Sequence, residues 1–91
     1  MKRYVIEREL PGVGKMNREQ LKQAAVTSCD ALAKLYGKAH WVQSYVAGDK
    51  TFCIYLADSE ASIREHARLS GFPANKITEA RTIIDPMTAY S

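Results

Sequence analysis

The side chains best suited to bind an ion are a cysteine and a histidine in the middle of the chain. Cys53 lies in a strand-like segment, and His66 lies in the helix-like segment that follows it. A thiolate and a neutral imidazole suit borderline divalent metals such as nickel, copper or zinc. Glu7 and Glu9, two positions apart on one strand, would add two carboxylates about 7 Å apart. We therefore consider a divalent transition-metal site made of Cys53 and His66, with Glu7 or Glu9 completing it.

The same residues allow other interpretations. The spacing of Cys53 and His66 is neither CxxC nor HExxH. His66 could instead be hydrogen-bonded to backbone or to a carboxylate, with Cys53 as a small apolar strand residue. A Cys–His nucleophile would need an activated thiolate and oxyanion donors, and no local sequence supplies them. Glu7 and Glu9 could be solvent or interface charges paired with arginines.

Aromatic residues in the same region suggest a different function, the binding of an organic molecule. Trp41, Tyr45 and Tyr55 could line a pocket or stack on a planar ligand, and aromatic side chains on a small sheet also form cores and dimer interfaces. Lys50 could neutralise an anion. The candidate ligand-binding set is Trp41, Ser44, Tyr45, Lys50 and Tyr55. No catalytic triad is recognisable, so an enzyme is not the favoured hypothesis, and a plain interaction domain also stays open.

Length and composition limit the class of protein. The 91 residues are enough for one modest core, so we expect a single domain over 1–91. The 46% hydrophobic and 25% charged residues are typical of a globular protein. The net charge of +3 forms no basic stripe for nucleic acid, and no apolar run is long enough to span a membrane. Glu7, Arg8 and Glu9 interrupt any signal-peptide core, so we expect a cytoplasmic protein. Two cysteines are too few for a disulfide scaffold, and in a reducing cytosol both should be free thiols.

Apolar periodicity and turn signals predict the order βαββαβ. The first helix has Asn17 as its cap, Gln20 as capping-box partner and Gly37 as its stop. Its expected buried face consists of Leu21, Ala24, Ala25, Ser28, Leu32, Leu35 and Tyr36, and we expect Cys29 to be buried as well. The strands are expected over 2–10, 39–46, 50–57 and 76–85, and the second helix over 60–70.

The hairpin around Ala47-Gly48-Asp49 decides which side chains share a face. If Val46 pairs with Thr51, Ser44 lies opposite Cys53 and Val42 opposite Tyr55. The other face would then carry Trp41, Gln43, Tyr45, Phe52, Ile54 and Leu56. A slip of one residue would exchange the two faces.

This order of elements predicts an α+β, ferredoxin-like fold. Two right-handed βαβ crossovers joined by a hairpin give a four-stranded antiparallel sheet with two helices on one face. The strands of the hairpin are apolar on both faces, although the helices cover only one. We therefore expect a homodimer formed through the open sheet face.

Four segments of the chain also resemble a known family. The segments are IERELPGVG, WVQSYVAGDKTFCIY, IREHARLSGFPANKI and IIDPMTA. Together they are similar to a small bacterial family of unknown function, part of which is described as nickel-binding. The resemblance implies a ferredoxin-like dimer and bound nickel or another transition metal. The polar positions that it implies for a site are Glu7, Glu9, Ser44, Tyr45, Lys50, Cys53, Tyr55 and His66.

Overall fold

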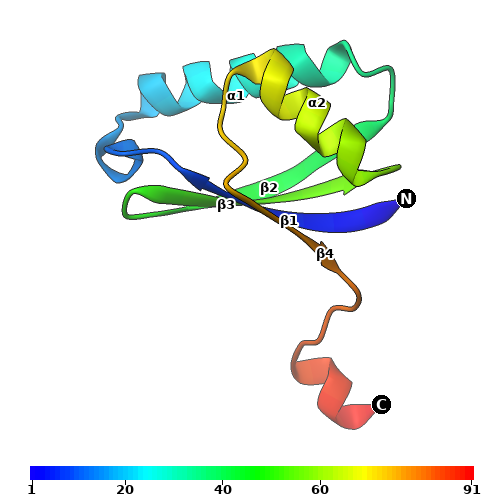
Figure 1. Ribbon diagram of the computed structural model, residues 1–91. Helices are drawn as coiled ribbons and strands as arrows, with labels where there is room; N and C mark the ends of the chain where they lie inside the picture. The colour runs from blue at the N-terminus through cyan, green and yellow to red at the C-terminus, as the bar shows by residue number, and fades with distance from the viewer.

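The computed structural model describes residues 1–91 and shows a four-stranded sheet with two helices on one face (Figure 1). The strands are β1 (Lys2–Glu9), β2 (Ala39–Ala47), β3 (Lys50–Ala57) and β4 (Lys76–Ala80). The helices are α1 (Arg18–Ala33) and α2 (Glu60–Ser70), with 3-10 turns η1 (Val13–Lys15) and η2 (Pro86–Tyr90). All strand pairs are antiparallel, in the order β2-β3-β1-β4. The predicted ferredoxin-like fold is confirmed.

Strict alternation along the two central strands separates the faces of the sheet. On β1, Tyr4, Ile6 and Arg8 are buried beneath the helices, and the intervening residues face the other way. On β3 the alternation is the same, and Cys53 and Tyr55 face the helices. The apolar core therefore lies between sheet and helices. It consists of Tyr4, Ile6, Leu35, Ala39, Cys53, Tyr55, Ala57 and Ile63.

The first helix begins at the cap that the sequence predicts, and the second helix is capped as well. The Asn17 side chain accepts a hydrogen bond from the Gln20 amide at 2.9 Å, and the Gln20 side chain accepts from the Asn17 amide at 3.0 Å. Ser59 caps α2, and Gly71 ends it in the left-handed conformation. α1 stops at Ala33, earlier than expected.

Only part of the predicted buried face of the first helix is buried in the structure. Ser28 and Ala31 are the only buried residues of the helix, whereas the Leu21 residue is 38% exposed. Cys29, expected to be buried, is exposed. Tyr36 is 91% exposed with a φ of 51°, because the chain turns away from the helix axis there. The N-terminal half of α1 therefore does not pack tightly on the sheet.

A bulge in β2 changes the predicted face of one aromatic residue. Val46 pairs with Thr51 and Ser44 with Cys53, as expected. The register then shifts between Trp41 and Gln43, so Trp41 rather than Val42 lies opposite Tyr55. The extra residue of a bulge shifts the inward–outward alternation of the strand by one position. Trp41 therefore lies on the helix side of the sheet, which corrects its predicted place beside Tyr45 on the open face.

The loop after β1 is fixed to the tip of the β2–β3 hairpin. The Leu10 amide donates to the Asp49 carbonyl at 2.8 Å, and the Gly14 amide donates to the Gly48 carbonyl at 2.9 Å. A Cβ on Gly14 would lie 2.5 Å from the Gly48 carbonyl oxygen, so this approach requires glycine. The contact holds Leu10 and η1 over the end of the sheet.

The C-terminal residues leave the sheet earlier than expected. β4 ends at Ala80 and not at residue 85, because its partner Arg3 is almost at the start of β1 and little strand is left to pair with. Residues 81–91, here called the C-terminal arm, extend from the sheet on the side away from the helices (Figure 1). Large apolar side chains on this arm are exposed, namely Ile83, Ile84, Met87 and Tyr90.

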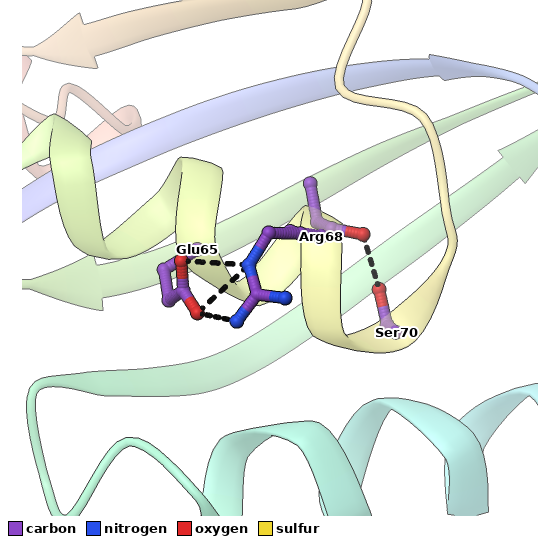
Figure 2. A network of polar contacts seen from close by, with 4 residues as sticks. Glu65, Arg68 and Ser70 are labelled. Carbon is purple, nitrogen blue, oxygen red and sulfur yellow. Dashed lines mark hydrogen bonds and ion pairs between the residues drawn. The ribbon is translucent and has the colours of Figure 1, made fainter.

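The outer side of α2 is a solvated, charged surface. Glu65 and Arg68 form an ion pair there (Figure 2), and Arg64 pairs with Glu60 at 2.9 Å. The Ser70 hydroxyl donates to the Ala67 carbonyl at 3.4 Å and secures the last turn. No helix is long and apolar enough to cross a membrane.

Candidate functional site

A cavity of about 290 Å³ lies between the N-terminal half of α1 and the sheet. Its walls are mostly apolar and come from α1, β2 and the loops beside them: Leu10, Val13, Met16, Leu21, Ala24, Ala25, Trp41, Val46 and Phe72. Its polar lining is Arg8, Ser28, Ser44, Thr51, Cys53 and Tyr55, with no acidic side chain. A second depression, of about 490 Å³, lies among strand ends near Met1 and Arg81 and contains none of the predicted site residues.

Four buried polar residues from four different elements meet beside the cavity, and three of them, Arg8, Ser28 and Tyr55, line it. The Arg8, Ser28, Tyr55 and His66 residues are at most 4% exposed, and His66 is fully buried. The Ser28 Oγ lies 2.9 Å from the Tyr55 hydroxyl and 3.2 Å from His66 Nε2. On the other side of the imidazole, Arg8 lies 3.5 Å from His66 Nδ1. The network joins β1, α1, β3 and α2 in the middle of the core.

The chemistry of arginine fixes the tautomer of His66. A guanidinium only donates hydrogen bonds, so Nδ1, which faces Arg8, is the accepting nitrogen. Nε2 therefore carries the hydrogen and points it at the two oxygens of Ser28, the Oγ at 3.2 Å and the carbonyl at 3.3 Å. Both ring nitrogens are engaged within the protein.

Burial sets the protonation states of this network. Burial lowers the pKa of His66 below its ordinary value of 6.5. The hydrogen bond to the Ser28 carbonyl partly opposes this effect, and the positive charge of Arg8 adds a smaller lowering of the pKa. Burial likewise raises the pKa of Tyr55, although hydrogen bonding to Ser28 and the charge of Arg8 partly oppose this. At neutral pH the site therefore holds a neutral imidazole, a protonated phenol and one positive charge.

Three of the five predicted ligand-binding residues line the cavity. Trp41 stacks on Tyr55 with ring centres 6.5 Å apart, and its Nε1 donates to Ser44 Oγ at 2.9 Å. Tyr45 is 57% exposed on the open face of the sheet, and Lys50 is exposed at the hairpin. The structure thus brings Trp41, Ser44 and Tyr55 together and leaves Tyr45 and Lys50 outside.

The four predicted metal ligands are not brought together within one protomer. Cys53 and His66 lie on the helix side of the sheet, and Cys53 Sγ lies 3.4 Å from the Thr51 hydroxyl. Glu7 faces the opposite side, 4.0 Å from Lys76 Nζ, and Glu9 is exposed at the strand end. No three His, Cys, Asp or Glu residues are grouped so that they could hold an ion.

Two central residues of the site, Arg8 and Ser28, were not among the predicted site residues, although Ser28 was expected on the buried face of α1. A signal for Arg8 was present in the alternation of β1, because a residue two positions after Ile6 shares its buried face. Nothing in the sequence indicated that Ser28 would contact a histidine on the other helix. Helix-to-helix contacts of this kind depend on tertiary packing, which the spacing of residues does not specify.

These features define a ferredoxin-like α+β domain with a cavity between helix and sheet. Comparison with protein families adds a more specific assignment: the family described as nickel responsive protein SCO4226-like matches residues 4–80, and the chain belongs to this family. The crystal structure of SCO4226 from Streptomyces coelicolor A3(2) superposes with a TM-score of 0.70 at 22% identity, over 90% of this chain and 99% of that one. This similarity shows a shared fold. No curated protein matches the sequence.

The lowered pKa of His66 predicts a loss of stability in acid. Since the unfolded chain protonates near pH 6.5 and the folded chain only at lower pH, the contribution of His66 is complete above about pH 6.5 and is lost as the pH falls toward the folded pKa. The slope is at most about 1.4 kcal/mol per pH unit. Urea unfolding between about pH 8 and pH 5 should show a shallower slope in His66→Gln.

The exposed histidine provides the control for this measurement. His40→Gln removes the other imidazole of the chain and should leave the slope unchanged, because His40 is exposed at the start of β2. An equal slope in the parent and in His66→Gln would show that the buried imidazole is not the titrating group.

Proposed function

We propose that this protein is a small binding protein of the nickel-responsive family that holds an organic ligand in the cavity between α1 and the sheet. The observation that carries the proposal is the combination of apolar walls with buried polar groups that converge on one side, Arg8 and Tyr55 above all. Small-molecule sites commonly have this composition. No catalytic group is part of the proposal, which describes binding without turnover.

The packing of α1 supports this proposal. Ala24 and Ala25 are only partly buried, and Leu21 is more exposed still, although all three face the sheet side of the helix and line the cavity. Burial of apolar surface yields about 25 cal/mol per Å². An apolar occupant would supply the contacts that the sheet does not make with this half of the helix.

A second candidate function is direct binding of nickel, for sequestration or sensing. The name of the family supports it, and the candidate ligands are Cys53, His66, Glu7 and Glu9. Within the protomer these residues do not fit an ion together: both nitrogens of His66 are engaged, and the charge of Arg8 lies beside Nδ1. An ion at His66 would therefore have to displace Arg8 from Nδ1 or Ser28 from Nε2. Of the two candidates, the geometry favours the organic ligand.

We further propose that the protein is a homodimer that associates through the open face of the sheet. Apolar side chains such as Val5, Phe52, Ile54 and Leu56 lie on that face and are only partly covered. The C-terminal arm extends on the same side of the sheet (Figure 1), and its own apolar side chains are exposed. A second copy related by a two-fold axis would cover the open face of each sheet, and an arm that packs on the sheet of the partner would be covered in both copies alike.

Filling the cavity tests the proposed function. Trp41 is the only tryptophan of the chain and lines the cavity, so its fluorescence reports on occupancy. We expect at least one probe among phenylpropanoate, phenylpropanamide and phenylpropylamine to change the fluorescence saturably. Ala25→Phe, which places a ring in the cavity, should weaken that binding by about tenfold or more. Ala33→Phe adds the same ring at an exposed position of α1 and should leave the affinity unchanged.

Calorimetric titration of the tag-free protein with nickel tests the second candidate, with zinc and copper for comparison. Direct binding predicts saturation at a whole number of ions per dimer, weaker binding in acid as the ligands protonate, and loss of binding in Cys53→Ala/His66→Ala. His40→Ala is the matched control. Absence of heat would eliminate this candidate, and undiminished binding in the double variant would place the ion elsewhere.

Mass in solution tests the dimer. Light scattering should give twice the chain mass for the parent and a single chain mass for Ile54→Glu, because a buried carboxylate without a partner opposes association strongly. Ile83→Asp/Ile84→Asp should weaken the dimer if the arm takes part. Ala61→Glu, on the exposed side of α2, is the control. A monomeric parent would refute the proposal.

A further inference from the structure

We propose that the ligand of this cavity is a monocarboxylate with a compact apolar body, bound through Arg8 and Tyr55. This inference rests on the proposed function and specifies the chemical class of its ligand. It begins from the charge balance of the cavity, which contains a buried cation and no anion.

The charge of Arg8 has no counterion in the protein. The Arg8 residue is 2% exposed and takes part in none of the ion pairs of the chain. Its protein contacts are neutral: the Pro73 carbonyl at 2.8 Å, His66 Nδ1 at 3.5 Å, and the rings of Tyr55 and Phe72 at 5.9 and 6.0 Å. A buried charge is unfavourable unless it is paired. An anion in the cavity would supply the missing partner.

The neighbouring carboxylates cannot take this role in the observed arrangement. Glu7 and Glu9 flank Arg8 in the sequence, but adjacent residues of a strand point to opposite faces. Glu7 lies with Lys76 on the open side of the sheet, and Glu9 is exposed. The lining of the cavity includes no Asp or Glu.

The hydrogen bonds among His66, Ser28 and Tyr55 allow the Tyr55 hydroxyl to act as a second donor beside Arg8. His66 Nε2 carries a hydrogen toward Ser28, so the Ser28 Oγ accepts there and can donate its own hydrogen to the Tyr55 oxygen, 2.9 Å away. In that arrangement the Tyr55 hydroxyl can donate its hydrogen to a ligand. Tyr55 lines the cavity as Arg8 does. Guanidinium and phenol together offer donors to an acceptor-only group, and an ionised carboxylate is such a group.

The single charge of Arg8 and the size of the cavity further restrict the class of ligand. One guanidinium balances one negative charge, so a monoanion fits better than a phosphate monoester with its greater charge. The remaining walls, which include Met16, Leu21 and Phe72, are apolar. A volume of about 290 Å³ is at the lower end of the range for organic ligands. The ligand is therefore compact and apolar apart from its carboxylate.

Matched probes that differ only in the head group test the inference on the unaltered protein. The probes are octanoate with octanamide, and phenylpropanoate with phenylpropanamide and phenylpropylamine, each titrated against Trp41 fluorescence. Because hydrogen bonds to charged groups are stronger than neutral ones, each carboxylate should bind about 10- to 100-fold more tightly than its amide. The amine should not bind. Comparison of octanoate with phenylpropanoate shows whether the cavity binds an aliphatic or an aromatic ligand more tightly.

Variants then assign the selectivity to the two donors. Arg8→Met keeps a long side chain but removes the charge, so carboxylate affinity should fall to that of the amide. Tyr55→Phe keeps the ring and should weaken carboxylate binding several-fold. Arg18→Met removes an exposed arginine of α1 and should have no effect. Near-ultraviolet circular dichroism verifies that each variant is folded, and the comparison of carboxylate with amide in the parent does not depend on any variant.

The outcomes separate this inference from the proposed function on which it rests. Equal affinity for carboxylate and amide, or tight binding of the amine, would overturn the ligand class and leave the cavity as the binding site. Unchanged carboxylate selectivity in folded Arg8→Met would overturn the role of Arg8. If no probe of any charge binds at millimolar concentration, the proposed function fails as well.

Discussion

The site depends on one charged side chain, Arg8, which occupies a position of β1 that the fold buries. Arg8 follows Tyr4 and Ile6 on the helix-facing side of β1, so the alternation that makes the core also buries a guanidinium. Its neighbours accommodate it with a carbonyl, an imidazole and two aromatic rings. The tautomer of His66 follows from this burial, because the guanidinium donates to Nδ1, and the cavity is lined by the same guanidinium.

Two backbone features place the walls around that charge. The bulge in β2 turns Trp41 onto the helix side, where it stacks on Tyr55 and contacts Ser44. The close approach of Gly14 to Gly48 holds the loop after β1 against the hairpin, which sets Leu10 and Val13 at one end of the cavity. The family assignment covers most of this framework, whereas the C-terminal arm lies beyond the matched residues 4–80.

The sequence was enough to predict the fold because its signals are local. The capping residues of α1 and the apolar run of β3 each specify an element directly, and the order of the elements leaves few topologies. The candidate site was predicted only in part. A single extra residue in β2 reversed the face of Trp41, and no local pattern signals that bulge. The pairing of His66 with Ser28 arises where two helices meet, and the spacing of residues along the sequence does not specify such a contact.

The N-terminal half of α1 does not pack tightly on the sheet, and for this reason binding in the cavity also affects how long the protein survives proteolysis. A helix whose first turns rest over a void opens more readily than the rest of the fold, and proteases act on such open states. A ligand that binds only the closed form adds RT ln(1 + [L]/Kd) to the free energy of unfolding. Cellular abundance would then rise with the concentration of the ligand, so that the amount of protein records the level of the molecule it holds.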